Sequence, residues 1–124
     1  MTWQRLRFAL RHLPLIAEAW GWLLLARFRH RPFPVSAPTH RSHPPEVLLR
    51  CFQIAAGHHL YRPTCLPRSI ALHRFLNRHG HPAAFQIGVR KEGKGLKAHA
   101  WVETGSQVVD DDPGNTANYH KLES

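Results

Sequence analysis

Residues 63–80 read PTCLPRSIALHRFLNRHG, a short loop followed by a helical pattern that begins at a cysteine. Pro67 fits the first turn of a helix, where its missing N–H costs nothing, and Gly80 suits a left-handed cap at the far end. The apolar residues between them cover a wide arc, as in a helix that packs on several sides. They are Leu66, Ile70, Leu72, Phe75 and Leu76. This stretch predicts a buried helix with Cys65 at its N-terminus.

The position of Cys65 makes it a candidate nucleophile. A helix N-terminus presents unpaired N–H groups and the positive end of the helix dipole. Such surroundings favour a thiolate, which is the nucleophilic form of cysteine. A cysteine nucleophile also needs a histidine within hydrogen-bonding reach and a third group that orients the histidine. If Cys65 is a nucleophile, the rest of the chain must supply that histidine and that third group.

The length and composition predict one globular domain. The chain has 124 residues, of which 43% are hydrophobic, enough for one modest core and too many for a disordered chain. We divide residues 1–124 into four consecutive parts. These are a helical lead-in (1–31), a proline-rich loop (32–45), a core region (46–113) and a polar tail (114–124).

The lead-in reads as a helix from Trp3 to about Arg31, capped by Thr2, interrupted at Pro14 and loosened at Gly21. Its longest apolar run is too short to cross a bilayer, so no stable membrane span is expected. Three interpretations remain open. The favoured one is a bent helix or helical hairpin packed on the core. The others are a docking surface for a partner protein and a helix that lies on a membrane surface.

The core region predicts helices followed by strands. A second helix is expected from about Glu46 to Ala56, before the helix that begins at Cys65. After Gly80 the apolar period changes from about 3.6 to 2, which predicts strands. They cover residues 85–90, 98–103 and 107–111, and the tail from Asn115 is expected to be polar and mobile. Helices first and an antiparallel sheet afterwards give an α+β fold.

The net charge of +9 is unevenly distributed. The first 100 residues carry sixteen basic and three acidic side chains, whereas the last 24 carry one and five. A basic body of this kind favours an acidic or peptide-like partner. The arginines form no recognisable RNA- or DNA-binding motif, so a nucleic-acid partner is not expected.

The two cysteines, Cys51 and Cys65, are too few for a secreted disulfide scaffold. Cys51 falls within an apolar helical pattern and is interpreted as a buried core residue, not as a partner of Cys65 in a disulfide. No secretory signal is evident, so a cytoplasmic location is expected. The eleven histidines raise the alternative of a zinc site, but no Cys-x-x-Cys or His-Glu-x-x-His spacing supports it. No metal or other cofactor is expected.

His99 is the favoured partner for Cys65 among the histidines. It lies in a predicted strand, where the direction of the side chain is fixed, and small Ala98 and Ala100 leave room around it. Most of the other histidines fall in predicted loops or on helical positions that look exposed. The competing interpretation is that His99 is a structural residue of an apolar strand.

The orienting carboxylate depends on the register of the last hairpin. A three-residue loop at 104–106 would place Asp111 opposite His99, at a spacing that suits an imidazole–carboxylate hydrogen bond. A two-residue loop at 105–106 would place Asp112 there, and one at 104–105 would place Asp110. The turn residues leave this choice open, and a solvated acidic turn is the alternative to all three.

Four segments carry a resemblance to a known family: TCLPRSIAL (64–72), FQIGVR (85–90), AHAWVE (98–103) and VVDDDP (108–113). In this order they resemble the lasso-peptide maturation proteases, the stand-alone transglutaminase-like B proteins of the microcin-processing type. The resemblance implies a papain- or transglutaminase-like cysteine-protease core over residues 46–113. It also implies that Cys65 is the nucleophile, His99 the general base and acid, and Asp111 the orienting carboxylate. No side chain could be assigned as an oxyanion donor, which leaves backbone N–H groups at the helix start.

The resemblance further implies a reaction and its partners. The enzyme would remove the leader from a ribosomal precursor peptide through a thioester on the cysteine. A separate leader-recognition protein would deliver the leader, and an ATP-dependent lasso cyclase would receive the freed core peptide. Two other functions remain open: a transglutaminase- or amidase-type acyl transferase on the same core, and a non-enzymatic basic binding module in which Cys65 and His99 are core residues.

Overall fold

The computed structural model describes residues 2–29, 31–34, 43–105, 107–109, 111 and 113–122. The middle of the predicted proline-rich loop, together with Asp110 and Asp112, lies outside these residues. The first four helices are α1 (Trp3–Arg11), α2 (Leu13–Ala26), α3 (Pro45–Gly57) and α4 (Cys65–Arg78). The strands are β1 (Ala84–Glu92), β2 (Gly95–Thr104), β3 (Gln107–Val109) and β4 (His120–Lys121), with the short helix α5 (Pro113–Thr116) before β4. The predicted α+β class is confirmed.

The predicted lead-in helix is divided into α1 and α2 at His12, just before Pro14. Pro14 has no N–H to donate to the preceding turn, but it is tolerated in the first turn of α2. Gly21 does not loosen the structure, since α2 continues through it to Ala26. The Pro14 prediction therefore holds, and the Gly21 prediction is wrong because the neighbouring apolar residues keep α2 packed.

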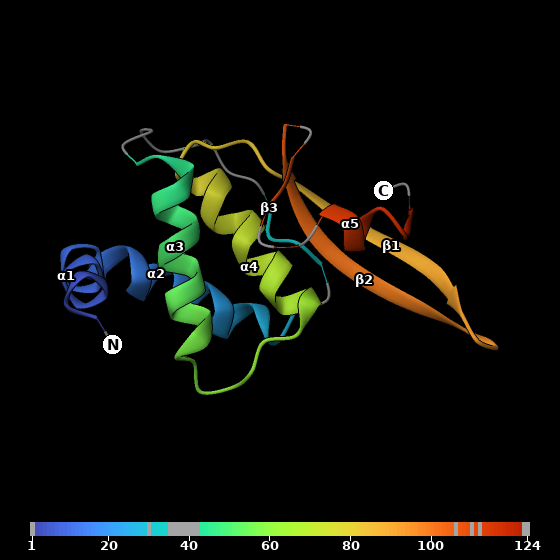
Figure 1. The fold of residues 1–124 in the computed structure, drawn as a ribbon, viewed down its shortest axis with the longest axis horizontal. Coiled ribbons are helices and arrows are strands. Elements are labelled where there is room, and N and C mark those ends of the chain that lie inside the picture. Colours follow the sequence, from blue (N-terminus) through green and yellow to red (C-terminus); the bar gives the residue numbers. More distant parts are fainter. Residues whose placement is uncertain are drawn as a thin grey trace.

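The sheet has the strand order β3-β2-β1-β4, and every pair of adjacent strands is antiparallel. In Figure 1 helices α1 to α4 gather on one side of the molecule, and the long β1–β2 hairpin extends away from them on the other. Gly93, at the end of this hairpin, has a φ of +59°, a conformation that glycine adopts without strain. No helix among the described residues is long and apolar enough to cross a membrane.

The main core lies between α2, α3 and α4 and extends to one face of β2. Its largest fully buried side chains include Phe52 from α3, Phe75 from α4 and Leu23 from α2. Val102 joins this cluster from the sheet, so α4 is packed both on helices and on strands. This explains the wide apolar arc of the α4 sequence.

The tail from Asn115 was predicted to be polar and mobile, but its described residues include helical and strand structure. Residues 114–122 form part of α5 and all of β4, and His120 and Lys121 pair with Val89 and Gly88 of β1. Tyr119, just before β4, is buried. A two-residue strand has no periodic pattern, and the segment is held by contacts with a strand about 30 residues earlier in the chain. Local sequence therefore gave no signal for it.

Candidate functional site

Cys65 is the first residue of α4, as the sequence predicts. Thr64 precedes it in an extended conformation and makes no side-chain hydrogen bond to the helix start. The carbonyl of Thr64 accepts the first intrahelical hydrogen bond, from the N–H of Arg68, at 3.1 Å. The N–H groups of Cys65 and Leu66 come before Arg68, so neither has an acceptor within the helix. Cys65 is thus partly exposed at a helix start whose first N–H groups need acceptors from outside the helix.

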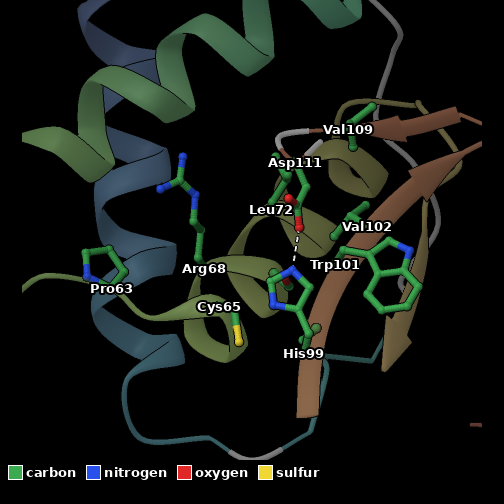
Figure 2. A pocket seen from close by; sticks show the side chains of 11 residues that line it. Pro63, Cys65, Arg68, Leu72, His99, Trp101, Val102, Val109 and Asp111 are labelled. Carbon is green, nitrogen blue, oxygen red and sulfur yellow. Dashed lines mark hydrogen bonds and ion pairs between the residues drawn. The ribbon is translucent and has the colours of Figure 1, made fainter. Parts of the chain in front are cut away.

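His99 on β2 and Asp111 after β3 form the closest polar contact of the site. Nε2 of His99 lies 2.5 Å from Oδ2 of Asp111, and each side chain is about four-fifths buried, at 18% and 19% exposure. An ionised carboxylate only accepts hydrogen bonds, so Nε2–H of His99 donates to Asp111. The other ring nitrogen, Nδ1, is then left as the acceptor. In Figure 2 it lies on the side of the ring toward Cys65.

The three side chains line one cavity of about 310 Å³ between α4 and the sheet (Figure 2). Arg68 and Ser69 add polar groups from α4, while Leu72, Val102 and Val109 supply apolar wall. No hydrogen bond joins the Cys65 sulfur to His99 in the described part of the chain. Catalytic hydrogen bonds of this kind are often long without substrate and shorten in the complex. The arrangement can thus supply a nucleophile, a base oriented by a carboxylate, and an apolar wall for a peptide.

Two aromatic rings support the imidazole of His99. Trp101, two residues along β2, stacks on it with ring centroids 5.9 Å apart and planes inclined by 24°. Tyr119 packs against it at 5.2 Å, and the two aromatic rings also contact each other. Gly88 on β1 makes this packing possible, because a Cβ there would lie 2.7 Å from Tyr119 Cβ and 2.8 Å from the Trp101 ring. These contacts restrict His99 to few orientations.

Trp101 is itself held by Glu103. Its indole N–H donates to Glu103 at 2.8 Å, and the ammonium of Lys121 on β4 lies 2.9 Å from the same carboxylate. Burial acts to raise the pKa of Glu103, but the hydrogen bonds from Trp101 and Lys121 outweigh it and keep this pKa below its usual value. Glu103 therefore stays ionised and joins β2 to β4 behind the site.

Trp101, Tyr119, Glu103 and Gly88 were not assigned to the site from the sequence. The segment AHAWVE contains Trp101 and Glu103, and two alternate residues on one strand share a face, which could have placed Trp101 beside His99. Tyr119 carried no such signal, because its contact with His99 crosses from the tail to β2. The glycine in FQIGVR likewise indicates a close approach only once its neighbours are known.

The sequence left the register open among three aspartates, and the family resemblance favoured Asp111. The three-residue loop that would place Asp111 directly opposite His99 is not the one observed. Val102 pairs with Val109, and Thr104 pairs with Gln107, which is the register of the two-residue connection. Gly105 has a φ of +61°, as tight hairpin turns require at their first position. Continued as a ladder, this register would face His99 with position 112. Asp111 reaches His99 instead because β3 ends at Val109 and Asp111 lies in a bend beyond it.

Cys51 is fully buried on α3, and neither cysteine is in a disulfide. Burial raises the pKa of the Cys51 thiol to about 11, so this cysteine stays protonated near neutral pH. Among the described residues, no group of three or more His, Cys, Asp or Glu side chains is arranged to hold a metal ion.

Comparisons with known proteins identify a family. The family model of the transglutaminase-like superfamily matches residues 8–124. The chain is also similar to the microcin J25-processing protein McjB of Escherichia coli, with 41% identity over 54 residues. That alignment covers 44% of this chain and 25% of McjB, so it spans about a quarter of the relative. No solved structure matches significantly. These matches confirm the resemblance seen in the sequence, and the chain belongs to the transglutaminase-like superfamily.

Proposed function

We propose that this protein is a cysteine peptidase that removes the leader from a lasso-peptide precursor. The observation that carries the proposal is the hydrogen bond between His99 and Asp111 in a cavity that also contains Cys65 at a helix start. The similarity to a protein named for processing microcin J25 supports a precursor peptide as the substrate. Cys65 acts as the nucleophile, His99 as the base and acid, and Asp111 as the group that orients His99.

The first half of the reaction forms a thioester. Nδ1 of His99 takes the proton of the Cys65 thiol, and the thiolate attacks the carbonyl carbon at the end of the leader. The tetrahedral intermediate collapses, the C–N bond breaks, and the His99 imidazolium gives its proton to the departing amine. That amine is the new N-terminus of the core peptide, and the leader remains on the Cys65 sulfur.

The second half releases the leader. His99 takes a proton from a water molecule, whose oxygen attacks the thioester carbonyl. The C–S bond breaks, the leader leaves with a free carboxyl group, and the proton on His99 returns to the sulfur. Asp111 keeps the Nε2–H of His99 engaged and stabilises the imidazolium that forms in each half.

The developing oxyanion needs donors close to the sulfur. The backbone N–H groups of Cys65 and Leu66 lie at the start of α4 and are not capped by the Thr64 side chain. We assign them the role of oxyanion donors, with support from the positive end of the helix dipole. This role requires no side-chain amide.

We also propose the partners that the family resemblance implies. A separate leader-recognition protein delivers the precursor, and an ATP-dependent cyclase receives the freed core. The net charge of +9 suits a peptide or protein of acidic character. The two unpaired cysteines suit a reducing compartment, so we propose that the reaction takes place in the cytoplasm.

The test is a cleavage assay on the full chain with a precursor peptide and the leader-recognition protein, read by intact-mass spectrometry. The proposal predicts a leader fragment with a free carboxyl group and a core peptide with a free amine. If a complete mixture leaves the precursor intact, the proposal is wrong. A basic binding module, in contrast, would bind the leader in a salt-sensitive way without cleaving it.

An acyl transferase would use the same triad with an amine in place of water. The same assay with an added primary amine distinguishes the two reactions. With peptidase activity, the leader product has the same mass with and without the added amine. With transferase activity, the leader product carries the amine and is heavier. Predominant amine adduct would replace the proposed hydrolysis with acyl transfer.

A further inference from the structure

Helix α1 presents an apolar ridge to solvent. Trp3 is 69% exposed and Leu10 is 64% exposed, with Leu6 between them and Leu13 just beyond the helix end. The spacing of three and four residues places the three helical side chains on one face of α1. A contiguous exposed apolar face of this kind marks an interaction site more often than scattered exposed residues do.

This ridge is not the face that holds α1 in the fold. Phe8, on the opposite side of the helix, packs against the core cluster, and the guanidinium of Arg50 on α3 lies 4.2 Å from its ring centroid. The backbone N–H of Arg5 is capped by the side chain of Thr2 at 3.3 Å. The helix is thus anchored and capped without using Trp3, Leu6 or Leu10.

Two arginines of α1 lie beside the ridge. Arg7 and Arg11 line a groove of about 700 Å³ together with Trp3 and Leu10 of the ridge. Arg5 lies on the side of α1 that faces α3, where it lines a second groove of about 300 Å³ with Arg50 and Gln53. Residues 2–17 contain no acidic side chain. This end of the molecule therefore combines an apolar ridge with a cationic flank.

We propose that α1 attaches the protein to an anionic lipid surface. The ridge enters the boundary between headgroups and acyl chains, and the flanking arginines contact lipid phosphates. Basic residues close to an anionic leaflet each strengthen attachment, and a tryptophan is favoured at the level of the headgroups. An exposed apolar ridge beside a cationic flank is the pattern of a helix that lies in the interface of an anionic membrane.

This attachment leaves the Cys65 cavity accessible. In Figure 1 α1 lies at one end of the molecule, with α3 and α4 between it and the sheet. The cavity is formed by α4, β2 and the segment after β3, away from α1. A membrane-attached molecule would thus present its cavity and its β1–β2 hairpin to the aqueous side.

The first test is co-sedimentation of the full chain with two kinds of vesicle, pure phosphatidylcholine and a mixture with phosphatidylglycerol. The wild-type chain should sediment with the anionic vesicles and not with the neutral ones. The Leu6→Glu, Leu10→Glu double variant should lose about tenfold or more in partitioning, because it removes two inserted apolar side chains. Leu96→Glu is the matched control, since Leu96 is 74% exposed at the other end of the molecule.

The second test separates the cationic flank from overall charge. Arg7→Gln with Arg11→Gln should weaken binding to anionic vesicles about tenfold, whereas Lys94→Gln with Lys97→Gln removes equal charge from the hairpin and should have a smaller effect. Circular dichroism checks that every variant is folded. The proposal is overturned if wild-type protein ignores anionic vesicles or if the ridge variant binds them as wild type does. It is also overturned if the ridge variant loses only its binding to the leader-recognition protein, because α1 is then a protein-docking helix.

Discussion

Strand patterns in the sequence predicted the contact between His99 and Asp111 only in part. The sequence predicted Asp111 at the end of the third strand (107–111) and His99 on the second, and the short contact between Nε2 and Oδ2 joins those two residues. Strand alternation left the choice among three successive aspartates open, and only the family resemblance pointed to Asp111. A bend after a strand cannot be derived from strand alternation. Strand patterns therefore could not predict which of the three aspartates contacts His99.

Replacement of Asp111 by asparagine should lower the rate of precursor cleavage by about two orders of magnitude or more. The amide has no negative charge to stabilise the imidazolium of His99, and it can favour the wrong tautomer. The measurement is the single-turnover cleavage rate with saturating enzyme. Asp112→Asn is the matched control and should retain most activity. A sensitive Asp112 and a tolerant Asp111 would contradict the assignment.

At the scale of elements, the sequence predicted α3, α4, β1 and β2 well because each has a clear apolar period. Cys65 begins α4, and Gly80 follows the helix with a φ of +81°, as expected for a left-handed cap. β4 was missed because pairing with β1, and not its own pattern, makes it a strand. The packing of Tyr119 behind His99 was missed for the same reason, whereas strand alternation could have indicated that of Trp101.

Gly88→Ala should destabilise the fold by about 1–3 kcal/mol, since the new Cβ would overlap Tyr119 and Trp101. The backbone of β1 or the two rings must then move, and His99 loses part of its support. Thermal denaturation followed by circular dichroism measures the change, with a fall in Tm of several degrees expected.

The control for Gly88 is Gly21→Ala. No atom lies within 4 Å of a Cβ built at Gly21, which is inside α2, so alanine there should stabilise the helix by about 0.5–1 kcal/mol. A Gly88 variant as stable as wild type would show that the two rings do not pack against β1 as described.

At the scale of the whole molecule, His73 reports on the contact between α4 and the sheet. The sequence suggested an exposed helical position, but His73 is buried against Phe85 of β1. Burial, and secondly the charge of Arg74, lower its pKa, although a backbone hydrogen bond at Ala83 opposes this. The wide apolar arc of α4 indicated packing on several sides, but it did not show that the position of His73 faces β1.

This burial predicts a stability that depends on pH. Below the ordinary histidine pKa of about 6.5, the unfolded chain binds a proton that folded His73 does not accept until lower pH. The His73 contribution is therefore complete above this value and is lost as the pH falls toward the lowered pKa of the folded state. His73→Gln should reduce the loss of stability between about pH 7.5 and pH 5.5. Chemical denaturation at both pH values measures this, and an unchanged difference would contradict a buried neutral His73.

The central claim is that Cys65 is the nucleophile, and the second cysteine of the chain provides its control. The deciding measurement is precursor cleavage by Cys65→Ala beside Cys51→Ala, followed by intact-mass spectrometry, with circular dichroism to confirm that both variants are folded. Cys51 is buried and protonated, so its variant should cleave at a rate close to wild type. The Cys65 variant should be folded and inactive. Cleavage by folded Cys65→Ala at the wild-type rate would contradict the account.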